Sequence, residues 1–154
     1  MSIRTWAVTA CLKTATSFLK FDRISSPNNL ASDLVRHPSV IERTTYASGK
    51  GDATYIVVER GAITYLEPPS RDYLQYQCKT LTEFMRRYYA QKIDSACTFE
   101  MARLEMKRAI AGKGTIPSGE FISQRNLLKA QLTDRLENYL QSTTFKFCRF
   151  LANM

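Results

Sequence analysis

The chain has 154 residues, of which 44% are hydrophobic, and it carries a formal net charge of +8. A chain of this length buries a core without disulfides or metal ions, so we expect residues 1–154 to form a single domain. No apolar run reaches the ~20 residues that a membrane-spanning helix needs, so we expect no transmembrane segment and a soluble protein. The positive charge favours an anionic partner or surface over a neutral one.

Four cysteines are spread along the chain without the spacing of a metal site: Cys11, Cys78, Cys97 and Cys148. They form no Cys-x-x-Cys pair, and His37 is the only histidine of the chain, so we expect neither a metal site nor a cofactor. Each cysteine lies in an apolar pattern of helical type. This pattern favours buried free thiols and a reducing intracellular compartment.

Residues 1–21 are basic, contain no acid and are rich in Ser and Thr, a composition that is typical of an organelle-targeting presequence. Apolar residues also recur at helical spacing from Val8 to Leu19. This second pattern favours a first helix that packs on the core. A loop at 25–29 and a short helical segment that ends at Pro38 are expected next.

Three runs rich in β-branched and aromatic residues follow between about residues 40 and 66, separated by two breaks that contain glycine. They predict a three-stranded antiparallel meander. The Gly-Lys-Gly of residues 49–51 closes a hairpin in this interpretation, because a phosphate-binding loop requires a helix after it. Tyr46, Tyr55 and Tyr65 fall one on each expected strand, where they either dock a partner protein or lie under the chain's own helices.

From Pro68 onward the apolar residues recur at helical spacing. Helices are predicted at about 70–93, 95–111 and 120–141, with Ser70 as the first N-cap and Gly112 and Gly114 after the second helix. Residues 142–154 fit either a short helix or a strand. The expected fold class is therefore α+β, with an N-terminal helix, the meander, and three helices that pack on one sheet face and on each other.

A basic cluster with interleaved tyrosines lies on the two predicted helices before Gly114. Cations for phosphates and aromatic rings for base stacking suit single-stranded nucleic acid or RNA. Acidic residues three or four positions away, such as Glu83 and Glu100, favour instead a solvated surface of paired charges. The candidate residues for an anion or nucleic-acid surface are Arg86, Arg87, Tyr88, Tyr89, Lys92, Arg103, Lys107, Arg108 and Lys113.

Both ends of the chain are basic and aromatic, and neither carries an acid over residues 1–21 or 141–154. Amphipathic segments of this kind lie on an anionic membrane or in the groove of a partner protein. The candidate contacts with a partner or a membrane are Trp6, Phe18, Phe145, Phe147, Arg149 and Phe150.

No catalytic residues are expected, because His37 belongs to no Ser-His or Cys-His arrangement, and we expect the chain not to be an enzyme. The leading hypothesis is a non-catalytic interaction or assembly protein, cellular or viral, that acts as a small structural subunit or linker of a larger complex or homo-oligomer. It would bind an acidic or anionic partner through Arg- and Tyr/Phe-rich surfaces. A nucleic-acid-binding protein that uses the cluster from Arg86 to Lys113 is the second hypothesis, and a membrane-surface or viral matrix-like protein is the third.

Overall fold

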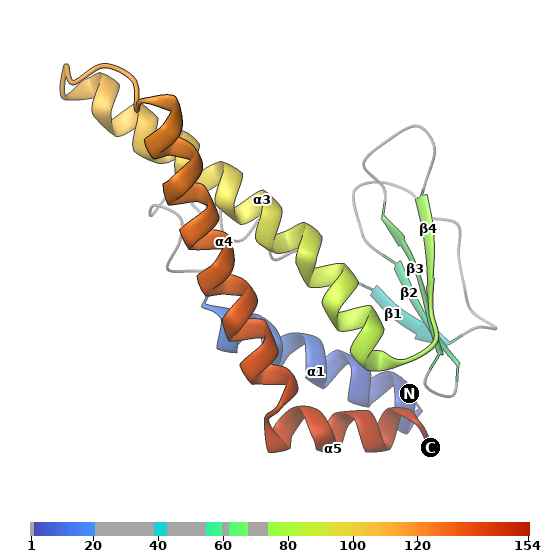
Figure 1. Cartoon of the computed structure of the whole chain (residues 1–154). Coiled ribbons are helices and arrows are strands. Elements are labelled where there is room, and N and C mark those ends of the chain that lie inside the picture. The colour runs from blue at the N-terminus through green and yellow to red at the C-terminus, as the bar shows by residue number, and fades with distance from the viewer. Residues whose placement is uncertain (1, 21–38, 43–54, 60–61, 68–73) are drawn as a thin grey trace.

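The computed structural model describes residues 2–20, 39–42, 55–59, 62–67 and 74–154 (Figure 1). The elements in chain order are α1 (Ile3–Leu19), β1 (Ser39–Glu42), β2 (Tyr55–Glu59), β3 (Ala62–Glu67), β4 (Leu74–Cys78), α3 (Leu81–Ile110), α4 (Ser118–Leu140) and α5 (Thr143–Ala152). The α+β class predicted from the sequence is confirmed. Figure 1 shows the sheet on one side of α3, while α1 and α5 lie side by side across the base of α3 and α4.

The first helix packs on the core, as its apolar spacing predicts. Ser2 caps α1, because its hydroxyl oxygen accepts a hydrogen bond of 3.2 Å from the amide of Thr5. The helix ends at Lys20, which adopts the left-handed conformation with a φ of 57°. The buried residues of α1 are Thr5, Ala7, Val8, Cys11, Leu12, Ala15 and Leu19.

The sheet is mixed and four-stranded, in the order β1-β2-β3-β4, so the prediction of a three-stranded antiparallel meander is wrong in two respects. Strand β1 pairs with β2 in parallel, which no hairpin can connect. Strand β4 occupies residues 74–78, which the sequence predicts as part of a helix. Leu74 and Cys78 are four residues apart, so they would lie on the same face of either a helix or a strand. Tyr76 between them is apolar as well, which gives the alternation of a strand.

One face of the sheet forms part of the hydrophobic core. Cross-strand partners share a face, and the register pairs Tyr65 of β3 with Ile56 of β2 and with Tyr76 of β4. The rings of Tyr65 and Tyr76 stack with centroids 4.9 Å apart, and Phe84 of α3 meets Tyr65 edge-on at 5.3 Å. Tyr65 is therefore covered by the chain's own helix rather than displayed to a partner. Tyr46 and the 49–51 loop lie outside the described residues.

Residues 81–110, which the sequence divides between helices at about 70–93 and 95–111, form one continuous helix, α3. Its N-cap is Thr80, whose hydroxyl accepts from the amide of Glu83 at 3.1 Å; Ser70 lies outside the described residues. Asp94 lies at the boundary between the two predicted helices, where a polar residue is typical of a helix start. Its carboxylate instead accepts a hydrogen bond from Arg125 of α4 at 2.9 Å, so it cross-links two helices and caps neither.

Local signals mark the boundaries of the last two helices. Gly112 and Gly114 have φ angles of +71° and +74°, which only glycine adopts freely, and they turn the chain from α3 into α4. Ser142 caps α5 by accepting from the amide of Phe145 at 3.2 Å, and residues 143–152 are helical rather than extended. Within the described part of the chain, no helix is both long and apolar enough to cross a membrane.

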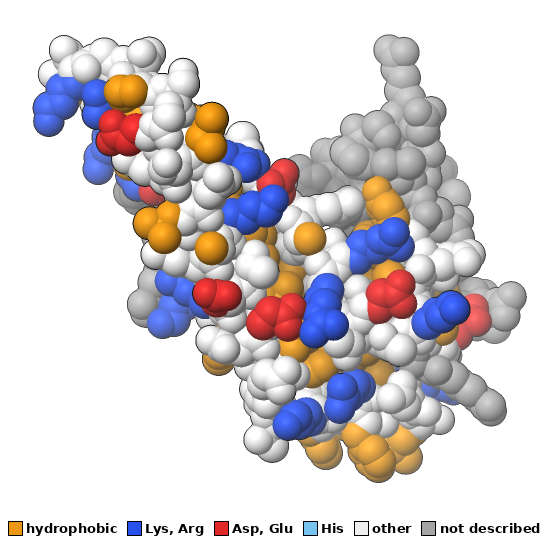
Figure 2. Space-filling view, viewed as in Figure 1, with side chains coloured by type: hydrophobic (Ala, Val, Ile, Leu, Met, Phe, Trp, Pro, Cys, Tyr) orange, Lys and Arg blue, Asp and Glu red, His pale blue; other side chains and the backbone are white. Residues whose placement is uncertain are grey.

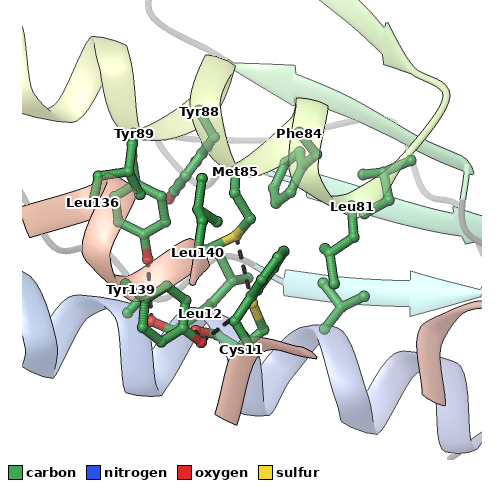
Figure 3. Close-up of a cluster of buried hydrophobic side chains, with 14 of the residues drawn as sticks. Cys11, Leu12, Leu81, Phe84, Met85, Tyr88, Tyr89, Leu136, Tyr139 and Leu140 are labelled. Carbon is green, nitrogen blue, oxygen red and sulfur yellow. Dashed lines mark hydrogen bonds between the residues drawn. The ribbon is translucent and has the colours of Figure 1, made fainter. Parts of the chain in front are cut away.

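The centre of the core lies where α1 meets α3 and α4 (Figure 3). Tyr89 of α3 and Tyr139 of α4 both direct their hydroxyl groups at the backbone of α1 (Figure 3). All four cysteines are free and buried, as the sequence predicts: Cys11, Cys78, Cys97 and Cys148.

Candidate interaction surfaces

The far half of the α3–α4 hairpin extends beyond the core. The last residue of α3 in the core cluster is Cys97, and the first fully buried core residue of α4 is Leu132. We call residues 98–127 the hairpin arm. Figure 1 shows that the arm projects away from the sheet and from α1 and α5. Since α3 has 30 residues, it is about 45 Å long, and only its first part has a sheet against it.

The arm is held together by a thin internal core and by ion pairs at its base. Met101 and Ile116 are its buried side chains. At the base, Asp94 accepts from Arg125 at 2.9 Å and lies 3.5 Å from the ammonium group of Lys129. These two cations lower the pKa of Asp94, the hydrogen bond from Arg125 being the largest cause.

The tip of the arm is basic. Lys107, Arg108 and Lys113 line an open pocket of about 440 Å³ between the end of α3 and the start of α4. The guanidinium group of Arg108 donates to the backbone carbonyls of Gly114 at 3.3 Å and Lys113 at 3.4 Å, so this side chain braces the loop. Neither Lys107 nor Lys113 forms an ion pair with a residue of the described part of the chain. Figure 2 shows Lys and Arg side chains gathered at this tip.

A row of large apolar side chains is exposed along the arm. Phe99, Met106 and Ile110 are spaced by seven and four residues, so they share one side of α3, and 83% of Ile110 is accessible to solvent. Met101 and Leu104, which face α4, lie on the opposite side of the helix. These three residues have the spacing of an apolar helix stripe, and spacing alone cannot show whether a helix face is covered.

The residues of the predicted basic cluster do not form one surface. Arg87 and Lys107 are twenty residues apart on one helix, which separates them by about 30 Å. Near the start of α3, Arg86 forms a bidentate pair with Glu137 of α4 at 3.0 and 3.1 Å, and Arg87 lies 5.1 Å above the ring of Tyr76. Arg103 is paired with Glu100, three residues before it, as the sequence predicts.

Tyr88 and Tyr89 are not available for base stacking. Each side chain is only 2% exposed, and the two rings meet edge-on with centroids 5.1 Å apart in the core. Lys92 is half-buried, and its ammonium group lies 5.3 Å from the ring centroid of Tyr88. The predicted combination of cations with accessible aromatic rings is therefore absent from this part of α3.

The two terminal helices carry a second exposed apolar surface, which we call the terminal face. It comprises Ile3 and Trp6 of α1 with Phe147, Phe150 and Met154 at the end of the chain. Helices α1 and α5 run antiparallel, so the first turns of α1 lie beside the last turns of α5 (Figure 1). Three of the predicted contact residues, Trp6, Phe147 and Phe150, belong to this face.

The other predicted residues of the terminal helices have different surroundings. Phe145 is fully buried and packs on Tyr139 with ring centroids 5.7 Å apart, so its assignment as a surface contact is wrong. Phe18 lies at the opposite end of α1 and also contacts Tyr139, at 5.8 Å. Arg149 is exposed, and its guanidinium group lies 5.8 Å from the ring of Phe145.

The residues that the structure describes contain no group of three His, Cys, Asp or Glu side chains that could hold a metal ion, and His37 lies outside them. Comparison of the chain with protein-family models, with curated proteins and with solved structures gives no match.

Proposed function

We propose that this chain is a non-catalytic interaction subunit of a larger assembly and that it binds an acidic protein partner through the hairpin arm. The observation that carries this proposal is the projection of a helical hairpin whose tip is basic and whose α3 side exposes a row of large apolar residues.

The charges of the tip favour an acidic partner. Lys107 and Lys113 have no ion-pair partner among the described residues, and Glu105 is the only acid between Arg103 and Lys113. Complementary charge steers a partner to the correct surface and raises the association rate. The two lysines offer this attraction without first breaking an existing ion pair.

The apolar row supplies the contact area that charge alone does not. Large exposed apolar residues beside a polar rim are typical of protein–protein interfaces. Phe99, Met106 and Ile110 lie in line along one side of α3, so a partner helix or groove can bury them together. The buried positions of Tyr88 and Tyr89 make the same surface a poorer match for single-stranded nucleic acid, which requires accessible rings.

Fluorescence anisotropy with a labelled poly-glutamate peptide tests the acidic-partner proposal. We expect the chain to bind this probe at low salt and the affinity to fall as salt rises. The double variant Lys107→Glu/Lys113→Glu should bind at least about tenfold more weakly, because two attractions become repulsions. The matched control is Lys146→Glu/Arg149→Glu, which changes the net charge equally on α5 and should bind as the original chain does.

Equal binding by both double variants would mean that the arm is ordinary solvated surface. A labelled single-stranded RNA serves as the competing probe. If RNA binds more tightly than poly-glutamate, and Lys107→Glu/Lys113→Glu abolishes that binding, the arm is a nucleic-acid surface and the protein-partner proposal is wrong.

A further inference from the structure

The terminal face is a second surface, independent of the hairpin arm. It lies at the base of the molecule, where α1 and α5 run side by side and the two ends of the chain come close together (Figure 1). Its apolar side chains are about half exposed or more, and Phe150 reaches 64%.

Helix α5 divides its surface into three rows. Phe145, Cys148 and Ala152 form the buried row. The exposed apolar row of the helix comprises Phe147 and Phe150, three residues apart, and Met154, just beyond the end of the helix, is exposed as well. Lys146 and Arg149 are exposed and lie beside the apolar row, displaced around the helix. Figure 2 shows this layout, with hydrophobic side chains along the lower edge of the molecule and Lys and Arg side chains just above them.

The charge of the two terminal helices is entirely positive. No acidic residue occurs from residue 2 to residue 20 or from residue 141 to residue 154. Lys13 and Lys20 of the α1 segment are exposed, as are Lys146 and Arg149. Among the residues that the structure describes, none of these four cations forms an ion pair, whereas Arg86 and Arg103 are paired with Glu137 and Glu100.

We propose that the terminal face docks on an anionic lipid bilayer, with α1 and α5 lying in the plane of the interface. Phe147, Phe150 and Trp6 enter the boundary between headgroups and acyl chains, where aromatic side chains are favoured. Lys146 and Arg149 stay one layer higher, at the level of the negative headgroups. This inference does not rest on the proposed function of the hairpin arm, because it uses other residues.

Charge argues against a second copy of the chain as the occupant. A two-fold contact through the terminal face would place the same basic rows of two copies against each other. Like charges across an interface cost binding free energy, and residues 2–20 and 141–154 contain no Asp or Glu side chain that would offset them. A bilayer offers an apolar layer below a negatively charged one. The apolar row of α5 matches the first layer, and the basic row beside it matches the second.

Vesicle flotation tests the proposal with two lipid compositions: pure phosphatidylcholine, and phosphatidylcholine containing phosphatidylserine. We expect the chain to float with the phosphatidylserine vesicles and to stay unbound with pure phosphatidylcholine. Trp6 is the only tryptophan of the chain, so its emission reports on this face directly. Its emission should shift to shorter wavelength when the vesicles are added.

Two double variants separate the apolar from the electrostatic contribution. Phe147→Ser/Phe150→Ser should reduce binding at least about tenfold, because two exposed rings no longer enter the interface. Its matched control is Met106→Ser/Ile110→Ser, which removes two exposed apolar residues from the hairpin arm and should float normally. Lys146→Glu/Arg149→Glu should also lose binding, whereas Lys107→Glu/Lys113→Glu should retain most of it. Circular dichroism of each variant establishes that it is folded.

Three results would overturn the proposal. The first is failure of the original chain to float with phosphatidylserine vesicles. The second is equal flotation of the terminal-face variants and their controls. The third is an unshifted Trp6 emission from bound protein, which would place another surface on the membrane. If the terminal face binds a protein partner instead, the chain should fail to float with phosphatidylserine vesicles. The proposal that the hairpin arm binds an acidic partner would be unaffected by that outcome.

Discussion

The phenolic hydroxyl of Tyr139, in α4, donates a hydrogen bond of 3.0 Å to the backbone carbonyl of Cys11, in α1. Tyr89 of α3 makes the equivalent bond to the carbonyl of Leu12, one residue further along, at 3.1 Å. Two long helices thereby hold adjacent backbone groups of the first helix (Figure 3). The hydroxyl of Thr14 lies 2.6 Å from the phenolic oxygen of Tyr139, and that of Thr16 lies 3.1 Å from the phenolic oxygen of Tyr89.

The Tyr139→Phe variant is expected to be less stable by about 1 kcal/mol, since a buried hydrogen bond is lost while the ring keeps its packing. Tyr89→Phe should have an effect of similar size. Urea denaturation followed by circular dichroism measures both. The control is Tyr76→Phe, at a half-buried position where the hydroxyl makes only a long contact of 3.4 Å with Gln91. If Tyr76→Phe costs as much as Tyr139→Phe, the two core hydroxyls have no special role in holding α1.

The sequence predicts helix ends best where they carry a local signal. Gly112 and Gly114 mark the end of α3 through their own backbone preferences, and the structure has the boundary there. For residues 142–154 the sequence leaves helix and strand open, and the structure shows a helix capped by Ser142. The sequence predicts a break inside α3 because the polar residue Asp94 resembles a helix cap. Only a tertiary contact, the pair with Arg125, shows that the helix continues through it.

The parallel pairing of β1 with β2 and the exposure of the arm both depend on long-range contacts. Adjacent strands predict a hairpin by default, and nothing local to Val40 indicates a parallel partner. Likewise, apolar spacing predicts that Phe99 and Ile110 share one side of α3. It does not predict that this side is left uncovered by the other elements of the described chain. The candidate surfaces were therefore only partly foreseen: exposed Trp6, Phe147 and Phe150 were identified, whereas the apolar row of the arm was not.

The thiol of Cys11 should be inert in the folded protein. Burial raises its pKa to about 12, so the reactive thiolate is scarce at neutral pH, and the side chain is inaccessible to reagents. Burial also raises the pKa of Cys148. We expect a thiol reagent such as DTNB to label the native chain at the rate of global or local opening, and the unfolded chain at once. Immediate labelling of Cys11 under native conditions, located by mass spectrometry, would contradict the packing of α1.

The Asp94 pair should make a small, pH-dependent contribution to stability. The hydrogen bond from Arg125 is the main reason why the pKa of Asp94 in the folded chain lies below its ordinary value of 3.8. The stabilisation is therefore fully present above pH 3.8. It is lost as the pH falls through the folded-state pKa. Half of the side chain is exposed, which screens the interaction, and Asp94→Asn should cost only about 0.5 kcal/mol at neutral pH. The difference between variant and original chain, measured by urea denaturation, should shrink in acid. A difference that stays constant down to acidic pH would show that the charge of Asp94 is irrelevant.

Two glycines of the hairpin arm should respond in opposite directions to replacement by alanine. Gly112 has a φ of +71°, a conformation that alanine adopts only with strain, so Gly112→Ala should destabilise the chain by about 1 kcal/mol. Gly119 lies near the start of α4 with an ordinary φ and open space around it, so Gly119→Ala should stabilise by about 0.5 kcal/mol through its helix propensity. Thermal unfolding of the two variants gives the sign of each change directly. A stabilising Gly112→Ala would mean that α3 continues past Ile110 instead of turning, and the basic tip formed by Lys107 and Lys113 would not exist in the form described.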